Sequence, residues 1–168
     1  MPVTLPPDLH SLIIDGFGDH DTDVGAAFDN SSEDEQQKIH EQVVAAAVGA
    51  EIVEEQGKFC AVTIIAHSDR VDNAASADEA RADELDISVQ RGDNAVTWLF
   101  EKIQGLLEDA GAPVPQTQDD LQSVVIFRVA AGAAHLVVTN PVSDDDRRQN
   151  RRVEFAVASF APVPAPVL

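Results

Sequence analysis

The chain has 168 residues, 44% of them hydrophobic, which fits a single domain with its own core. Its formal net charge of -19 repels phosphate backbones and anionic lipids, so we expect no nucleic-acid partner. One cysteine, Cys60, excludes an internal disulfide, and the five scattered histidines give no zinc-ligand spacing. No apolar run reaches the roughly 18 residues of a membrane span. We therefore predict no membrane insertion by this chain, no metal and no cofactor.

The first third of the chain predicts a short strand, a turn and a helix. Residues 10–15, HSLIID, predict the strand, and the glycine-punctuated DGFGDHDTD predicts the turn. Its clustered Asp residues resemble a calcium loop, but the D-x-D-x-D-G match and the terminal Glu are missing, which favours a solvated acidic turn. Ser32 followed by Glu35 is a capping-box pattern, and apolar residues recur at helical spacing as far as Ile52.

A central strand with a polar end follows. Residues 58–66 are a continuous apolar and β-branched run, typical of a strand covered on both faces. His67, Ser68 and Asp69 come directly after it, at the end of the strand where open α/β sheets usually bind ligands. His67 and Ser68 cannot pair as base and nucleophile, because neighbours on a strand point to opposite faces, and no G-x-S-x-G elbow is present. We therefore expect a protein that is not an enzyme.

The second half of the chain predicts a long helix and two or three strands. Residues 70–86 are polar and Ala-rich, which indicates a surface excursion that could hold a short helix. The helix then begins near Ile87, carries Arg91 in its first turns and ends at the Gly-Ala-Pro sequence after Ala110. Spacing alone leaves open that Asp69 caps a turn and that Arg91 makes only a surface ion pair.

Three segments near the C-terminus have strand or turn character. Residues 121–130 predict a strand, and residues 133–141 predict either another strand or a turn with a short extended piece. Apolar residues alternate from Val153 to Val157, which indicates a half-buried final strand. Long helices alternating with strands predict an α/β sandwich with one sheet and both helices on the same face. We assign an N-terminal loop to residues 1–9, the domain to residues 10–158 and a Pro-rich tail to residues 159–168.

Three motifs resemble those of one known family. They read A-H-S-D (residues 66–69), I-S-V-Q-R-G (residues 87–92) and R-R-Q-N-R-R-V-E (residues 147–154). In this order they resemble the C-terminal domain of outer membrane protein A, which recurs in peptidoglycan-associated lipoproteins and flagellar motor stators. The resemblance implies an OmpA-like fold, a mixed sheet with two long helices on one face. It also implies non-covalent binding of peptidoglycan through the diaminopimelate of the stem peptide, in the periplasm or cell envelope.

The resemblance implies roles for individual residues. Asp69 matches the Asp that receives the ammonium of the ligand, and Arg91 matches the Arg that binds its carboxylate. Ser68 and His67 accompany Asp69 as candidate ligand-binding residues. The late motif gives a supporting role to Arg147, Asn150, Arg151 and Arg152. These arginines would pair with carboxylates near the site and orient the final strand; the alternative is a peripheral ligand contact from Arg147 or Arg151.

The chain also departs from the family pattern. Ala66 replaces the usual Gly, and the Gly that commonly follows the Asp is absent from Arg70-Val71-Asp72. The segment before Arg91 is longer and acidic, and Glu84 falls where the family has Asn, so we expect it to compete for Arg91. No signal peptide is visible at the start of the sequence. These features support an alternative, in which the domain binds no peptidoglycan and serves as a structural or assembly component of a larger complex. A contractile injection or phage-tail-like particle, assembled in the cytoplasm, is one such complex.

Overall fold

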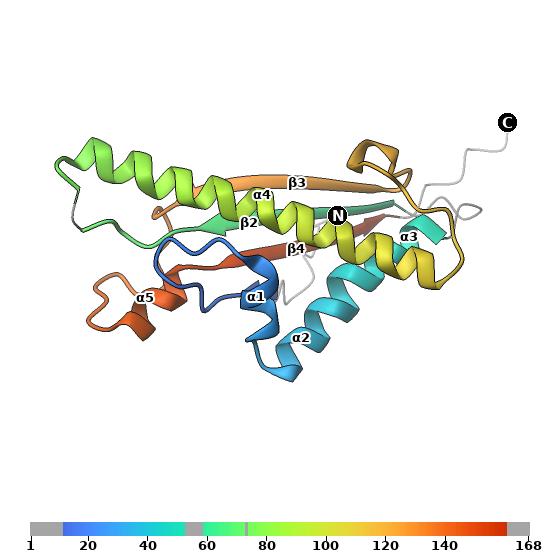
Figure 1. Cartoon of the computed structure of the whole chain (residues 1–168), viewed down its shortest axis with the longest axis horizontal. Coiled ribbons are helices and arrows are strands. Elements are labelled where there is room, and N and C mark those ends of the chain that lie inside the picture. Colours follow the sequence, from blue (N-terminus) through green and yellow to red (C-terminus); the bar gives the residue numbers. More distant parts are fainter. Residues whose placement is uncertain (1–11, 53–58, 73, 161–168) are drawn as a thin grey trace, which may run out of the picture.

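A four-stranded mixed sheet forms the centre of the protein in a computed structural model, which describes residues 12–52, 59–72 and 74–160 (Figure 1). The strands are β1 (Leu12–Ile14), β2 (Phe59–His67), β3 (Val124–Gly132) and β4 (Val153–Phe160). Their order is β1-β4-β2-β3, with β4 antiparallel to β1 and β2, and β2 parallel to β3. The predicted N-terminal loop lies outside the described residues, as does the predicted tail apart from Ser159 and Phe160, which belong to β4.

Helices cover one face of this sheet, as Figure 1 shows for α3 and α4. α4 packs on β2 and β3, and α3 packs on β2. The helical elements are α1 (Val24–Asp29), α2 (Glu33–Ile39), the π-helical turn η1 (His40–Val44), α3 (Ala45–Ile52), α4 (Ala77–Asp109), the short 3-10 helix η3 (Gln118–Asp120) and α5 (Asp144–Asn150). The predicted fold class, an α/β sandwich with a mixed sheet and two long helices on one face, is confirmed. None of the described helices combines the length and the apolar character needed to cross a membrane.

The first long helix begins at the predicted capping box. The Ser32 hydroxyl accepts a hydrogen bond from the Glu35 amide at 3.3 Å, and the Glu35 carboxylate accepts one from the Ser32 amide at 3.0 Å. Acidic residues fill its first turn, where the helix dipole favours negative charge. α2, η1 and α3 run without a break through residue 52, so the predicted helix is confirmed, with one widened turn.

The second long helix begins ten residues earlier than predicted. α4 starts at Ala77, where the Ser76 hydroxyl accepts a hydrogen bond from the Glu79 amide. The segment at residues 70–86 was predicted as a surface excursion that could hold a short helix; its residues 77–86 are indeed mostly exposed and helical, but they are the first turns of α4 and not a separate helix. Residues 77–86 are mostly exposed, so they carry no apolar stripe, although their Ala, Glu and Arg content favours a helix.

The two faces of the sheet differ in how far their side chains are buried. On the helix-covered face, alternate residues of β2 such as Val62 and Ile64 are fully buried. On the other face, Val125, Phe127 and Val129 of β3 are 45–54% exposed. The prediction that β2 is covered on both faces is wrong, because the residues between its buried positions are only half-buried. Within the described residues, helices cover a single face.

The segment between β3 and β4 forms turns and a helix that the sequence analysis missed. Residues 133–142 form turns and bends. Of the two alternatives for residues 133–141, the turn is therefore confirmed and the strand is wrong. The Ser143 hydroxyl then accepts a hydrogen bond from the Asp146 amide, and the Asp146 carboxylate accepts one from the Ser143 amide. This capping box starts α5, whose last turn carries Arg147 and Arg148. α5 therefore lies where the arginine cluster begins and leads directly into β4.

Candidate functional site

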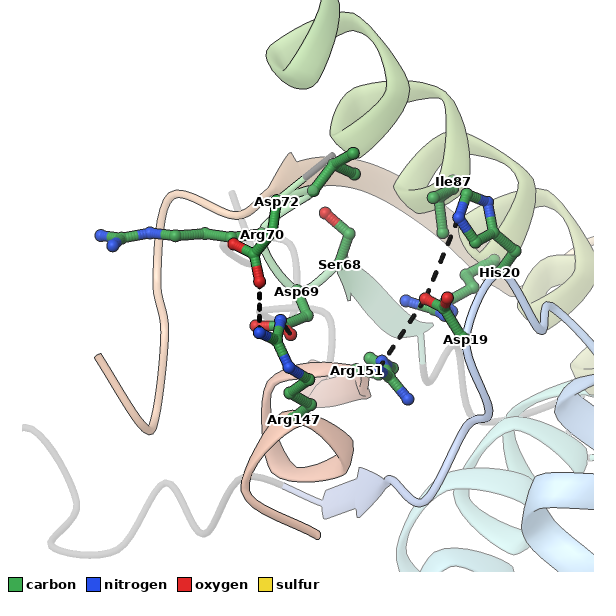
Figure 2. Close-up of a pocket in the computed structure, with 11 residues that line it drawn as sticks. Asp19, His20, Ser68, Asp69, Arg70, Asp72, Ile87, Arg147 and Arg151 are labelled. Carbon is green, nitrogen blue, oxygen red and sulfur yellow. Dashed lines mark hydrogen bonds and ion pairs between the residues drawn. The ribbon is translucent and has the colours of Figure 1, made fainter. Parts of the chain in front are cut away.

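A cavity of about 340 Å³ lies where β2 ends, between the loop after β1, the loop after β2, α4 and α5 (Figure 2). The chemistry of its lining is strongly charged. The lining residues are Asp19, His20, Ser68, Asp69, Arg70, Val71, Asp72, Ile87, Arg91, Arg147 and Arg151. Asp69 and Arg91, which are far apart in the sequence, therefore face the same cavity.

Asp69 lies on one wall of the cavity with both carboxylate oxygens engaged. Oδ2 accepts a hydrogen bond from Arg147 Nη1 at 2.8 Å, and Oδ1 accepts one from Asn150 Nδ2 at 2.9 Å. The Asp69 side chain is only 5% exposed. Asn150 is fully buried and also exchanges two hydrogen bonds with the backbone of Val138. The amide of Asn150 thus fixes the orientation of the Asp69 carboxylate relative to the loop before α5.

Arg91 lies in the middle of α4 and is 1% exposed. The predicted position in the opening turns of the helix is wrong, because α4 starts earlier. The alternative of a surface ion pair is also wrong. Its guanidinium donates to three backbone carbonyls: from Nε to Asp21 at 2.7 Å, from Nη1 to His67 at 2.8 Å and from Nη2 to Gly18 at 3.5 Å. It also lies 5.0 Å from the centre of the Phe17 ring.

Three acids lie near Arg91 without pairing with it directly, and the charges of Asp21, Asp19 and Asp69 favour its protonated form. Among the described residues, no carboxylate oxygen lies within 4.0 Å of its guanidinium, and a second buried cation, Arg151, is close. Burial and the charge of Arg151 lower the pKa of Arg91 to about 10. Arg91 remains protonated at neutral pH, so the floor of the cavity holds a buried positive charge. Burial makes this charge costly, and the nearby acids offset only part of the cost, so a bound anion that pairs with the guanidinium directly would stabilise it further.

The arginine cluster connects α5 to three other parts of the chain. Arg151 donates to Asp144 at 3.0 Å and to the Phe17 carbonyl at 3.4 Å, which ties α5 to the loop after β1. Arg152 donates to Glu154 at 2.7 Å and to the His135 carbonyl, and this contact holds the loop after β3. Arg147 makes the third connection, to Asp69 and Asp72 in the loop after β2. The arginines therefore gather where the loops after β1, β2 and β3 converge and present carbonyls and carboxylates.

Of the two candidate residues before Asp69, Ser68 lines the cavity and His67 does not. The His67 side chain lies against Glu154 and Arg152, with Nε2 3.3 Å from Glu154 Oε1, and it does not line the cavity. The pleat of β2 turns it to the other side of the sheet, and only its carbonyl takes part in the site, as an acceptor for Arg91. Burial lowers the pKa of His67 to about 4, and the charge of Arg152 adds to this. Ser68 lines the cavity, and its buried hydroxyl has no hydrogen-bond partner among the described residues.

Two acids at the mouth of the cavity were not singled out by the sequence analysis. Asp72 forms an ion pair with Arg147, and Asp19 lies 3.8 Å from Arg151, as Figure 2 shows. No local signal marks them, because both are exposed loop residues in a chain rich in Asp. Glu84 does not compete for Arg91 as we expected. Its carboxylate accepts a hydrogen bond from the Val71 amide at 3.1 Å and does not line the cavity.

The described part of the chain contains no group of three or more His, Cys, Asp or Glu side chains placed to hold a metal ion. What the cavity offers is a fixed carboxylate, a buried guanidinium and an unpartnered hydroxyl. This set suits a small molecule that carries both an ammonium and a carboxylate group.

Comparisons with known proteins do not assign the chain to a family. Neither a family model nor a curated protein matches it. Two solved structures show a distant likeness. The periplasmic domain of MotB from Helicobacter pylori is 11% identical, with a TM-score of 0.40, over 86% of this chain and 71% of that chain. A putative MotB-like protein from Desulfovibrio vulgaris is 22% identical, with a TM-score of 0.34, over 68% of this chain and 59% of that chain. These values are too low to assign a function, so the functional argument rests on the cavity.

Proposed function

We propose that this protein is a non-covalent peptidoglycan-binding module of the cell envelope that recognises the diaminopimelate of the stem peptide. Asp69 receives the ammonium of the ligand, and Arg91 binds its carboxylate. The module acts by binding alone, without catalysis. The proposal joins the three sequence motifs, which resemble the OmpA C-terminal domain, to the charges of the cavity.

The observation that carries the proposal is the buried guanidinium of Arg91 on the floor of a cavity that Asp69 also lines. A guanidinium has five N–H groups, and the described residues accept hydrogen bonds from only three of them. A ligand carboxylate that takes the remaining two would be a directly paired negative charge with a bidentate contact. The same carbonyl contacts keep the guanidinium in place before the ligand arrives, which lowers the entropic cost of binding.

The experiment is co-sedimentation with purified cell-wall sacculi that contain diaminopimelate. Asp69→Asn removes the charge while keeping the shape, and Arg91→Lys keeps a charge but loses the forked donor geometry. We expect each change to weaken binding by about tenfold or more, since hydrogen bonds to charged groups contribute about 1.5–3 kcal/mol. Asp93→Asn is the matched control, because Asp93 pairs with Arg128 at the surface and does not line the cavity.

Equal sedimentation of the wild type and the two cavity variants would contradict the assigned roles. Arg91→Ala is a poorer test than Arg91→Lys, because the buried side chain bonds three carbonyls and its loss will also destabilise the fold.

A second function is supported by a different observation. The uncovered sheet face exposes Val125, Phe127 and Val129 in a chain of net charge -19, and such apolar surface is typical of protein contacts. This favours the alternative in which the domain is a structural component of a larger assembly. A wild type that ignores sacculi and migrates with a large particle in native extracts would support it, and a monomeric wild type that sediments with sacculi would not.

A further inference from the structure

We infer that the free site is occupied by the protein's own Arg147, whose guanidinium takes the place on Asp69 that the ligand ammonium needs. We further infer that Asp72 is the carboxylate that retains Arg147 when the ligand displaces it. This inference rests on the proposed function, and it concerns how the same site is controlled.

The starting point is the pairing of Asp69. Its two oxygens are bonded to Arg147 Nη1 and Asn150 Nδ2, and its side chain is 5% exposed. An ammonium that reaches this carboxylate meets the positive charge of Arg147 at hydrogen-bond distance. Since Oδ1 is held by the buried Asn150 and the carboxylate is almost enclosed, an ammonium can bind Oδ2 directly only by displacing Arg147 Nη1.

The second step concerns where Arg147 goes. Its other terminal nitrogen, Nη2, is already paired with Asp72, as Figure 2 shows. The Asp72 side chain is 56% exposed and that of Arg147 is 28% exposed, so both lie at the mouth of the cavity, where side chains can rotate into solvent. Arg147 can therefore release Asp69 and keep one ion pair, which lowers the free energy needed for the exchange.

Of the other three arginines that line the cavity, Arg70 is exposed and is not one of the two residues that donate to Asp69, and the two buried arginines cannot make this exchange. Arg91 and Arg151 are 1% and 4% exposed and are bonded to backbone carbonyls that belong to the frame of the site. Arg147 differs from both, because its cavity-facing hydrogen bonds go only to side chains. It therefore forms the movable part of the site, and the family departure at residues 70–72 supplies its second partner.

The test is a double-mutant cycle, read by isothermal titration with a soluble, diaminopimelate-containing stem peptide. Arg147→Gln removes the internal competitor and should tighten binding about tenfold, which is about 1.4 kcal/mol. Asp72→Asn leaves displaced Arg147 without a carboxylate and should weaken binding about threefold to tenfold. In the Arg147→Gln background, Asp72→Asn should have no further effect, because there is no longer a guanidinium to retain.

Two further variants keep the test interpretable. Arg148→Gln removes the same charge from the same helix, but Arg148 pairs with Asp144 and does not line the cavity, so affinity should stay unchanged. Arg147→Lys cannot span both carboxylates and should bind the peptide with intermediate affinity. Thermal melting of each variant shows whether it folds. If Arg147→Gln does not fold, Arg147→Lys takes its place in the test.

The outcomes separate the inference from the proposed function. Suppose that the wild type binds the peptide and that Asp69→Asn abolishes this binding. If Arg147→Gln then binds the peptide more weakly than the wild type, or equally well, the inference is overturned and the proposed function stands. Arg147 would in that case be a ligand contact or have no role in binding. Binding by Arg147→Gln without measurable wild-type binding supports the inference. No binding by the wild type or any Arg147 variant overturns both.

Discussion

The floor and the mouth of the cavity use the same residue types in opposite ways. On the floor, Arg91 and Arg151 are buried and bond to backbone carbonyls, so their positions are part of the fold. At the mouth, Arg147 and Asp72 are partly exposed and bond only through side chains. The difference indicates that the floor fixes the geometry of the site, whereas the mouth controls access to it. Changes at the floor should therefore affect stability and binding together, and changes at the mouth should affect mainly binding.

The largest expected effect is that of Arg91→Ala. Removing this side chain takes the donor away from the carbonyls of Asp21 and His67, whereas the Gly18 carbonyl keeps its bond from the Asp21 amide. We expect a loss of about 3–5 kcal/mol in the free energy of unfolding, together with loss of sacculus binding. Denaturant unfolding measures the first quantity. Arg128→Ala, which removes a half-exposed arginine, is the control and should cost less than about 1 kcal/mol. A melting curve for Arg91→Ala that matches the wild type would show that the floor is not structural.

The next effect is a pH dependence of the free energy of unfolding, which arises from the buried side chain of His67 at the end of β2. Its pKa is about 4 in the folded protein, below the ordinary value of 6.5, because burial and Arg152 oppose protonation. Below pH 6.5 the unfolded chain binds this proton more readily than the folded one. The stability contributed by neutral His67 is therefore complete above that pH and declines as the pH falls toward 4, by on the order of 3 kcal/mol. His67→Gln should flatten this part of the stability curve, and an unchanged curve would contradict the role of His67.

A smaller effect is expected from Ser143→Ala at the start of α5. The hydroxyl of Ser143 caps this helix, and its loss should cost about 1 kcal/mol. Because α5 carries Arg147, fraying should also loosen the contact with Asp69 and raise the rate of ligand association. Stopped-flow measurement of that rate tests the link between helix and mouth. If the stability falls while the association rate stays the same, α5 does not control access.

The smallest effect is expected from Arg148→Gln. The side chain is 50% exposed and pairs with Asp144 one turn away, so its loss should change the free energy of unfolding by less than about 0.5 kcal/mol. A loss several times larger would show that the whole arginine cluster, and not its buried members alone, supports the fold. Thermal melting at low and high salt distinguishes the two cases.

The sequence predicted those parts of the fold that carry a hydrophobic period or a capping pattern. Ser32 with Glu35 marked the first long helix, because a capping box satisfies the free N–H groups of a helix start. The apolar run before His67 marked the central strand, because its alternate residues are buried against the helices. The early part of α4 was missed, since residues 77–86 face solvent and have no apolar stripe. α5 was missed although Ser143 and Asp146 form a capping box, because seven residues are too few to show a period.

The sequence predicted less of the candidate site. The motifs pointed to Asp69 and Arg91, and the structure places both on one cavity. Sequence alone could not show that Arg91 is buried, because an arginine in a helix is usually exposed and two of its three carbonyl partners lie in a loop 70 or more residues away. The pairing of Arg147 with Asp72 likewise depends on how α5 meets the loop after β2, and no local sequence pattern indicates such a contact.

The most direct test of the central claim is nuclear magnetic resonance titration of the wild-type domain with free diaminopimelate, following the arginine side-chain Nε–H signals. The Nε–H of Arg91 is buried and donates to the Asp21 carbonyl, which should protect its signal from exchange with solvent. The account predicts that the signals of Arg91 and Arg147 shift together at one saturable affinity, whereas that of Arg128, which lines no part of the cavity, stays in place. An Arg91 signal that does not move at saturating diaminopimelate would contradict the claim that its guanidinium binds the ligand.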